Sequence, residues 1–275
     1  MTKQHYPSIK QGFALILWYI LFSIVAVIAL MPLGIDAASG SSLGNFGYYV
    51  ISMGLLAALG LKNSSREVPI VGDFTKMTWW AVLLLIPLVV LNIIVIDPLV
   101  SLIPMPDAFK ELFEDLLKRD LFTFLTIVIA APILEEFVFR GIVLEGFLKN
   151  YDAKKSIIWS AVLFGAVHLN PWQFIGAGIL GAYIGWVYYR TRSLIPCIII
   201  HMVNNLIAFL GFYYFPDIDS FQELSPSLTA TLVALLGAVV SLIVVVKALD
   251  KGMPEAPIYM EEKEVMEEEV ADLKE

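Results

Sequence analysis

The sequence has few charged residues and almost no cysteine. Only 16% of its 275 residues are Asp, Glu, Lys or Arg, whereas 59% are hydrophobic and the mean hydropathy is +0.79. Soluble globular domains contain about 25% charged residues, so this composition excludes an ordinary soluble domain and favours a membrane protein. The single cysteine, Cys197, excludes an intramolecular disulfide, and its position in an apolar run predicts packing rather than chemistry.

Several functional signatures are also missing. The chain has no His-Glu-x-x-His zinc motif, no glycine-rich phosphate loop and no evident internal repeat. Its net charge of −8 argues against nucleic acid as a partner. Much of the negative charge lies in residues 251–275, which we interpret as an acidic, solvated tail. Residues 1–250 then form one integral membrane domain, with the catalytic helices within 121–215.

Eight apolar runs approach or exceed the length of about 20 residues that a helix needs to cross a bilayer. The runs are 12–35, 45–61, 78–96, 121–148, 156–169, 172–189, 194–215 and 228–246. The run 156–169 is the shortest. The sequence therefore predicts an all-α fold, that of a polytopic integral membrane protein with about eight transmembrane helices around a polar intramembrane cavity.

The basic residues predict how the chain crosses the lipid bilayer. If the eight runs alternate in direction, 14 Lys and Arg residues fall on one side and only Lys110, Lys118 and Arg119 fall on the other. Cytoplasmic loops are enriched in Lys and Arg, so we expect a multi-pass protein of the cell membrane with both termini in the cytoplasm. Residues 107–118 alternate apolar and charged side chains at helical spacing, which predicts an amphipathic helix at the outer interface.

Ionisable residues inside the apolar runs indicate a functional site, because charge is costly at that depth. Glu135, Glu136 and Arg140 lie in the run 121–148. Glu136 and Arg140 are four residues apart and share one helix face, so we expect an ion pair between them. Glu135 points about 100° away from Glu136, which leaves it without an obvious partner in its own helix. An ion pair that only holds helices together is the structural alternative.

Two histidines and an asparagine fall at a depth similar to that of Glu135. Glu135, His168, His201 and Asn205 lie about 9 to 13 positions from the cytoplasmic ends of their runs, or roughly 14 to 20 Å of helical rise. His201 and Asn205 are four residues apart and share a helix face. A lone intramembrane histidine usually joins helices, but this convergence favours amide hydrolysis, which needs a base, a water position and oxyanion donors close together.

Three motifs occur in a fixed order among these residues. They are Glu-Glu-x-x-x-Arg at 135–140, Phe-x-x-x-His at 164–168 and His-x-x-x-Asn at 201–205. In a multispan protein they resemble the three motifs of the CAAX protease and bacteriocin-processing family, also called the Abi family. That family includes the type II CAAX prenyl endopeptidases. The resemblance covers residues 121–210.

The resemblance implies a glutamic intramembrane protease with no cofactor and no metal. Carried over to this sequence, it implies that Glu135 activates the water and that His168 helps to position it. His201 and Asn205 would stabilise the oxyanion, a role for which an amide NH₂ and an imidazole N–H are suited. Glu136 and Arg140 would be structural support. The implied substrate is a peptide or lipidated protein in the bilayer, such as a prenylated CAAX protein that loses its C-terminal tripeptide.

Three other functions stay open at the level of sequence. Glu135, His168 and His201 could ligate zinc, since two histidines and a carboxylate form a recognised catalytic set, and a zinc-dependent membrane protease would be sensitive to chelators. Buried carboxylates and histidines also relay protons in transporters, although no inverted repeat is evident. A non-catalytic membrane scaffold could use the same fold, because a fold does not fix an activity.

Overall fold

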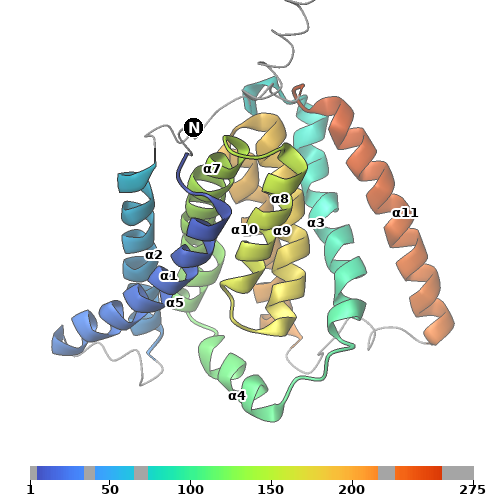
Figure 1. Ribbon diagram of the computed structural model, residues 1–275. Helices are drawn as coiled ribbons and strands as arrows, with labels where there is room; N and C mark the ends of the chain where they lie inside the picture. The colour runs from blue at the N-terminus through green and yellow to red at the C-terminus, as the bar shows by residue number, and fades with distance from the viewer. Residues whose placement is uncertain (1–4, 34–40, 65–73, 216–226, 256–275) are drawn as a thin grey trace, which may run out of the picture.

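The structure is a computed structural model that describes residues 5–33, 41–64, 74–215 and 227–255, with no strand among them. The predicted all-α fold is therefore confirmed, and a helix occupies most of each of the eight predicted runs (Figure 1). The α-helices are α1 (Ile9–Leu30), α2 (Ser42–Asn63), α3 (Trp79–Val100), α4 (Asp107–Leu116), α5 (Leu121–Phe124), α6 (Ala131–Glu136), α7 (Glu145–Leu148), α8 (Ala153–Ala166), α9 (Pro171–Thr191), α10 (Leu194–Tyr214) and α11 (Leu228–Gly252).

Within the described residues, six helical segments are long and apolar enough to cross a membrane. They are α1, α2, α3, the continuous run Leu121–Leu148, α10 and α11. The other two predicted spans are helical but differ from these six: α8 has only 14 residues, and α9 has 21 residues but is less apolar. The protein is thus a multi-pass integral membrane protein. The acidic tail predicted for 251–275 lies outside the described residues from 256 onward.

The predicted span 156–169 is wrong at its end, because α8 stops at Ala166 and His168 lies in the turn that follows. Leu169 has a positive φ of 56°, which a helix cannot contain, and Pro171 disfavours helical backbone at the residue before it. Asn170 then caps α9 by accepting a hydrogen bond from the Gln173 amide. The catalytic candidate His168 is therefore carried by a turn rather than by a membrane-spanning helix.

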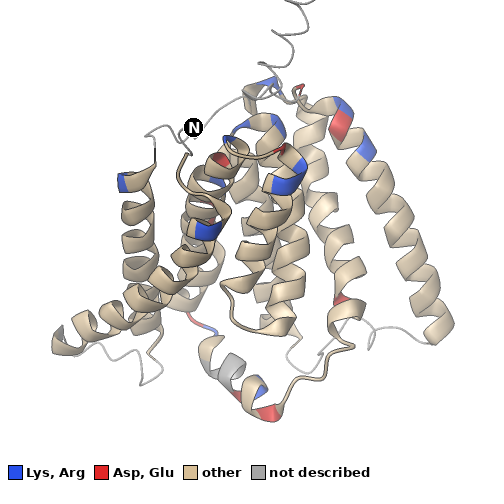
Figure 2. Cartoon of the chain, viewed as in Figure 1, with Lys and Arg blue, Asp and Glu red and all other residues tan. Residues whose placement is uncertain are grey.

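Basic side chains are concentrated at one end of the bundle. Most Lys and Arg residues gather at the end where the α7–α8 turn lies and where α11 finishes (Figure 2). The predicted amphipathic segment forms α4 and lies at the other end (Figure 1). There Phe109 packs on Trp172 at 5.2 Å between ring centroids, and the Trp172 indole donates to the Ile103 carbonyl at 3.0 Å. The segment 107–116 thus docks against the beginning of α9.

The run Leu121–Leu148 lies between two hydrophobic cores. Leu144 and Leu148 pack with residues of α3, α9, α10 and α11, whereas Val138, Val143 and Phe147 pack with residues of α1, α2 and α8. Contacts on both sides bury every residue from Val138 to Leu148. A charged side chain between Val138 and Leu148 must therefore find its partners inside the protein, because an unpaired buried charge is costly.

Two π-helical segments interrupt this central helix, η4 (Leu125–Ala130) and η5 (Phe137–Leu144), and they flank the two glutamates. π-helical turns are rare and occur often at functional sites. In η4 the Ala131 amide donates to the Thr126 carbonyl, five residues earlier. The next amide in that register would come from Pro132, which has none. The Ile127 carbonyl therefore accepts no main-chain hydrogen bond from residue 132.

Candidate active site

The Glu136–Arg140 ion pair predicted from helical spacing is present and completely buried. Arg140 Nη1 lies 3.0 Å from Glu136 Oε1, and both side chains have 0% exposure. Arg140 Nη2 donates to the Gly181 carbonyl at 3.1 Å, and the guanidinium lies over the Phe164 ring at 4.3 Å from its centroid. An added Cβ at Gly181 would lie 3.0 Å from Phe164 and 3.3 Å from Arg140 Nη2, so a larger residue there would require these side chains to shift.

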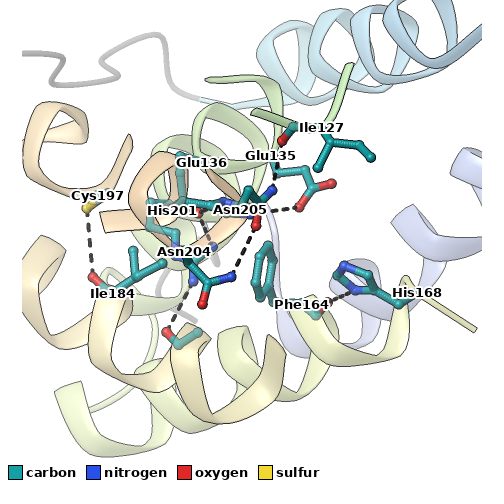
Figure 3. Close-up of polar contacts among 12 residues, drawn as sticks. Ile127, Glu135, Glu136, Phe164, His168, Ile184, Cys197, His201, Asn204 and Asn205 are labelled. Atoms are coloured by element: carbon teal, nitrogen blue, oxygen red, sulfur yellow. Dashed lines mark hydrogen bonds and ion pairs between the residues drawn. The ribbon is translucent and has the colours of Figure 1, made fainter. Parts of the chain in front are cut away.

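His201 connects this ion pair to the second glutamate. Its Nδ1 lies 2.8 Å from Glu136 Oε1, the same oxygen that accepts from Arg140. A carboxylate oxygen accepts, so Nδ1 carries a proton, and the other ring nitrogen is aimed elsewhere. His201 Nε2 lies 3.9 Å from Glu135 Oε2 (Figure 3). The two adjacent carboxylates therefore flank one imidazole, which is only 4% exposed.

Glu135, which the sequence left without a partner, is held from another helix. Tyr49 of α2 donates its hydroxyl to Glu135 Oε1 at 2.5 Å. The other carboxylate oxygen, Oε2, is buried and has no hydrogen-bond partner among the residues that the structure describes. Buried polar atoms are nearly always paired, so an unpaired oxygen at this position requires an explanation. A carboxylate with one fixed and one unpaired oxygen can accept a proton at the second.

Asn205 is fixed by contacts on both sides of its amide. Its Nδ2 donates to the Ile127 carbonyl at 2.9 Å, the group that Pro132 leaves without a main-chain donor. Its Oδ1 accepts from Asn204 Nδ2 at 3.1 Å (Figure 3). The NH₂ group carries two N–H donors, so one N–H is left after the bond to Ile127. That N–H is the group that a reacting carbonyl oxygen could use.

His168 joins this group through an aromatic ring rather than through a direct hydrogen bond. Its Nδ1 lies 2.9 Å from the Phe164 carbonyl and therefore donates, which leaves Nε2 as the acceptor in a neutral ring. Phe164 stands edge-on to both histidines, with centroids 5.6 Å from His168 and 5.5 Å from His201 (Figure 3). In the described part of the chain, no hydrogen bond links His168 to Glu135 or Asn205.

Sequence reasoning missed the groups that orient the motif residues. Tyr49, Ile127 and Gly181 each contact a motif side chain, and two of these three contacts use main-chain carbonyls. A carbonyl belongs to every residue and gives no compositional signal. Tyr49 lies in the earlier apolar run 45–61. That run contains other aromatic residues, so the sequence does not single out Tyr49 as a contact of Glu135. Among the residues that the structure describes, no group of three or more His, Cys, Asp or Glu side chains is arranged to hold a metal ion.

The site and its helices are those of a membrane protein in which a buried carboxylate, a histidine and an amide come together. The family model of the type II CAAX prenyl endopeptidase Rce1-like proteins matches residues 117–207, which include all three motifs. The segment 117–207 is therefore similar to this protease family, as its motifs predicted. No curated protein and no solved structure matches the chain.

Proposed function

We propose that this protein is an intramembrane endopeptidase that hydrolyses a peptide bond with a water activated by Glu135. The observation that carries this proposal is the position of Glu135 Oε2, which is buried, has no hydrogen-bond partner among the described residues and lies 3.9 Å from His201 Nε2. That separation exceeds the roughly 2.7 to 3.2 Å of a direct N–H···O bond, and one water molecule can bridge it. A carboxylate that shares a water with a histidine is suited to general-base catalysis.

In the proposed reaction, the water oxygen attacks the scissile carbonyl carbon while Glu135 Oε2 takes one of the water protons. The carbonyl π electrons move onto oxygen, and the oxyanion accepts hydrogen bonds from Asn205 Nδ2 and His201 Nε2. Donation from Nε2 requires a doubly protonated His201 ring, because Nδ1 already carries the proton that faces Glu136. Collapse of the intermediate breaks the C–N bond, and the proton on Glu135 passes to the leaving amine. His168 Nε2, the acceptor nitrogen of a neutral ring, would accept a hydrogen bond from the attacking water.

A prenylated C-terminal CAAX peptide is the substrate class that we propose, on the strength of the matched family. The test uses the purified full chain in detergent with a farnesylated CAAX peptide, and the readout is release of the C-terminal tripeptide. The same peptide without the prenyl group is the matched substrate control. Hydrolysis of the farnesylated peptide by the wild-type chain supports the proposal. Absence of hydrolysis, or equal hydrolysis by a Glu135→Gln chain, overturns it.

We further propose that the basic end of the bundle faces the cytoplasm, as the positive-inside rule predicts. Lys154→Cys and Lys118→Cys place thiols at exposed positions near opposite ends of the bundle. In sealed right-side-out vesicles, a membrane-impermeant maleimide is expected to label Cys at 118 and to label Cys at 154 only after the vesicles are opened. The wild-type chain is the blank, because its one cysteine is buried. The opposite labelling pattern would contradict this orientation and with it the cytoplasmic termini.

We expect peptide hydrolysis to persist after exhaustive dialysis against EDTA or phenanthroline. The proposed base is a glutamate, and Asn205 is a poor ligand for zinc. The measurement is kcat/KM before and after chelation, with the metal content of the protein determined in parallel. A separate zinc protease, treated in parallel, is the control for effective chelation, because it should lose activity and regain it on addition of Zn²⁺. The same loss and recovery of activity in this protein would establish the zinc-dependent alternative.

A further inference from the structure

We propose that Tyr49 is a positioning residue for Glu135, an assignment that rests on the proposed function. Tyr49 lies on α2, outside the matched segment 117–207, and is 86 residues from Glu135 in the sequence. Its hydroxyl donates to Glu135 Oε1 at 2.5 Å, a distance typical of an O–H···O⁻ bond to a charged acceptor. It is the one side chain that donates to this carboxylate in the part of the chain that the structure describes.

The helix that carries Tyr49 is fixed along the whole catalytic run. At one end, the Ser42 hydroxyl donates to the Asp120 carboxylate, which caps α5 through the Thr123 amide. At the other end, Gly60 packs so closely on Ile142 that an added Cβ would lie 2.7 Å from its Cδ1. Contacts on either side of Tyr49 leave its hydroxyl little freedom to move away from Glu135. Burial alone would raise the pKa of Asp120, but the bonds from Ser42 and Thr123 lower it.

Tyr49 also has a local brace within α2. The buried Ser52 hydroxyl donates to the Tyr49 carbonyl at 3.1 Å, three residues earlier. Side-chain bonds of this kind are characteristic of serine in buried helices, where the hydroxyl has no water to bind. Ser52 thus fixes the backbone from which the tyrosine ring extends. The tyrosine side chain, which has only two rotatable bonds before its hydroxyl, then reaches Glu135.

The chemical consequence is that Tyr49 selects the carboxylate oxygen that acts as the base. A donor on Oε1 leaves Oε2 as the oxygen that can accept the water proton, and Oε2 is the oxygen that faces His201. Loss of the hydroxyl should therefore remove the hydrogen bond to Oε1 and free the carboxylate to rotate. Loss of a hydroxyl that merely filled space would have neither effect.

The decisive comparison is between Tyr49→Phe and Tyr48→Phe in the full chain. Tyr48 is the neighbouring residue. It is hydrogen-bonded to Tyr19, which lies near Glu135, and no hydrogen bond from Tyr48 to Glu135 itself occurs among the described contacts. The infrared band of the Glu135 carboxylate, isolated by subtracting the Glu135→Gln spectrum, reports on its hydrogen bonding and requires no activity. We expect Tyr49→Phe to shift the frequency of this band, because the substitution removes the hydrogen bond to Oε1. Tyr48→Phe should change the band much less.

Turnover of the farnesylated peptide gives the second readout. Tyr49→Phe is expected to lower kcat by roughly 10- to 100-fold with little change in KM. An unchanged carboxylate band, or an equal change in Tyr48→Phe, would overturn the role of Tyr49. A wild-type chain that does not cleave the peptide overturns the proposed function instead, while the infrared band still decides whether Tyr49 positions Glu135.

Discussion

Glu135→Gln is expected to reduce kcat for peptide hydrolysis by on the order of 10³ to 10⁴, the upper range for removing a general base. The amide of glutamine cannot take a proton from water, but its Oε1 can still accept from the Tyr49 hydroxyl at the same position. The substitution removes no packing volume and leaves no buried charge without its partner. The variant should therefore be extracted in normal yield and keep the thermal midpoint of the wild-type protein.

The neighbouring Glu136→Gln is the matched control for this result. Glu136 is fully buried and its Oε1 serves both Arg140 and His201, so neutralising it leaves a buried guanidinium without its counter-charge. Breaking such a pair costs about 3 to 5 kcal/mol, and we expect a large fall in thermal stability together with loss of activity. The measurement is kcat beside the unfolding midpoint of both variants. Near-normal turnover in Glu135→Gln would show that another group activates the water.

The motif residues could be predicted from the sequence because charge inside apolar runs is conspicuous. Glu136 and Arg140 were paired correctly by helical spacing, since four residues bring two side chains to one face even though η5 begins between them. The α-helical angle between Glu135 and Glu136 also separated the paired carboxylate from the other. These inferences depend only on local geometry, which a single helix determines by itself.

The parts that the sequence did not predict depend on contacts between helices. His168 was expected inside a span, but the helix ends two residues earlier because Leu169 and Pro171 impose a turn. The two π-helical segments were also not foreseen, because they arise where tertiary packing holds a helix in a wider register. Tyr49 reaches Glu135 only because α2 lies against the central run. Periodicity along one helix contains no information about which neighbour it meets.

Pro132 lacks an amide N–H, and the effect of this absence on the site depends on the three-dimensional structure. Its missing N–H could be read from the sequence, but its consequence required the η4 register, in which Pro132 would be the donor to Ile127. The carbonyl so released binds Asn205 from α10, 78 residues away. An imino acid in the central helix thus fixes the proposed oxyanion donor in another helix, and it connects two of the three sequence motifs without belonging to either.

Asn205→Ala is expected to lower kcat by on the order of 10² to 10³, the range for deleting one oxyanion donor, with a much smaller change in KM. An oxyanion donor strengthens its contact as negative charge develops in the transition state, so its loss appears mainly in kcat. The assignment to Asn205 rather than Asn204 rests on the His-x-x-x-Asn motif and on the helix face that Asn205 shares with His201. The contacts do not decide it, because each NH₂ group donates one N–H, Asn204 to Asn205 and Asn205 to Ile127, and each retains a second.

Parallel kinetics on Asn204→Ala test this division of roles. Removing Asn204 frees the Asn205 oxygen but leaves the bond from Asn205 to Ile127, so we expect a loss in kcat of no more than about tenfold, the worth of one neutral hydrogen bond. Both variants should have similar thermal midpoints, because each removes one half-buried amide from the same turn of α10. A large fall in kcat for Asn204→Ala beside a near-normal Asn205→Ala enzyme would move the donor to Asn204. It would also weaken the alignment of His201 and Asn205 with the third family motif.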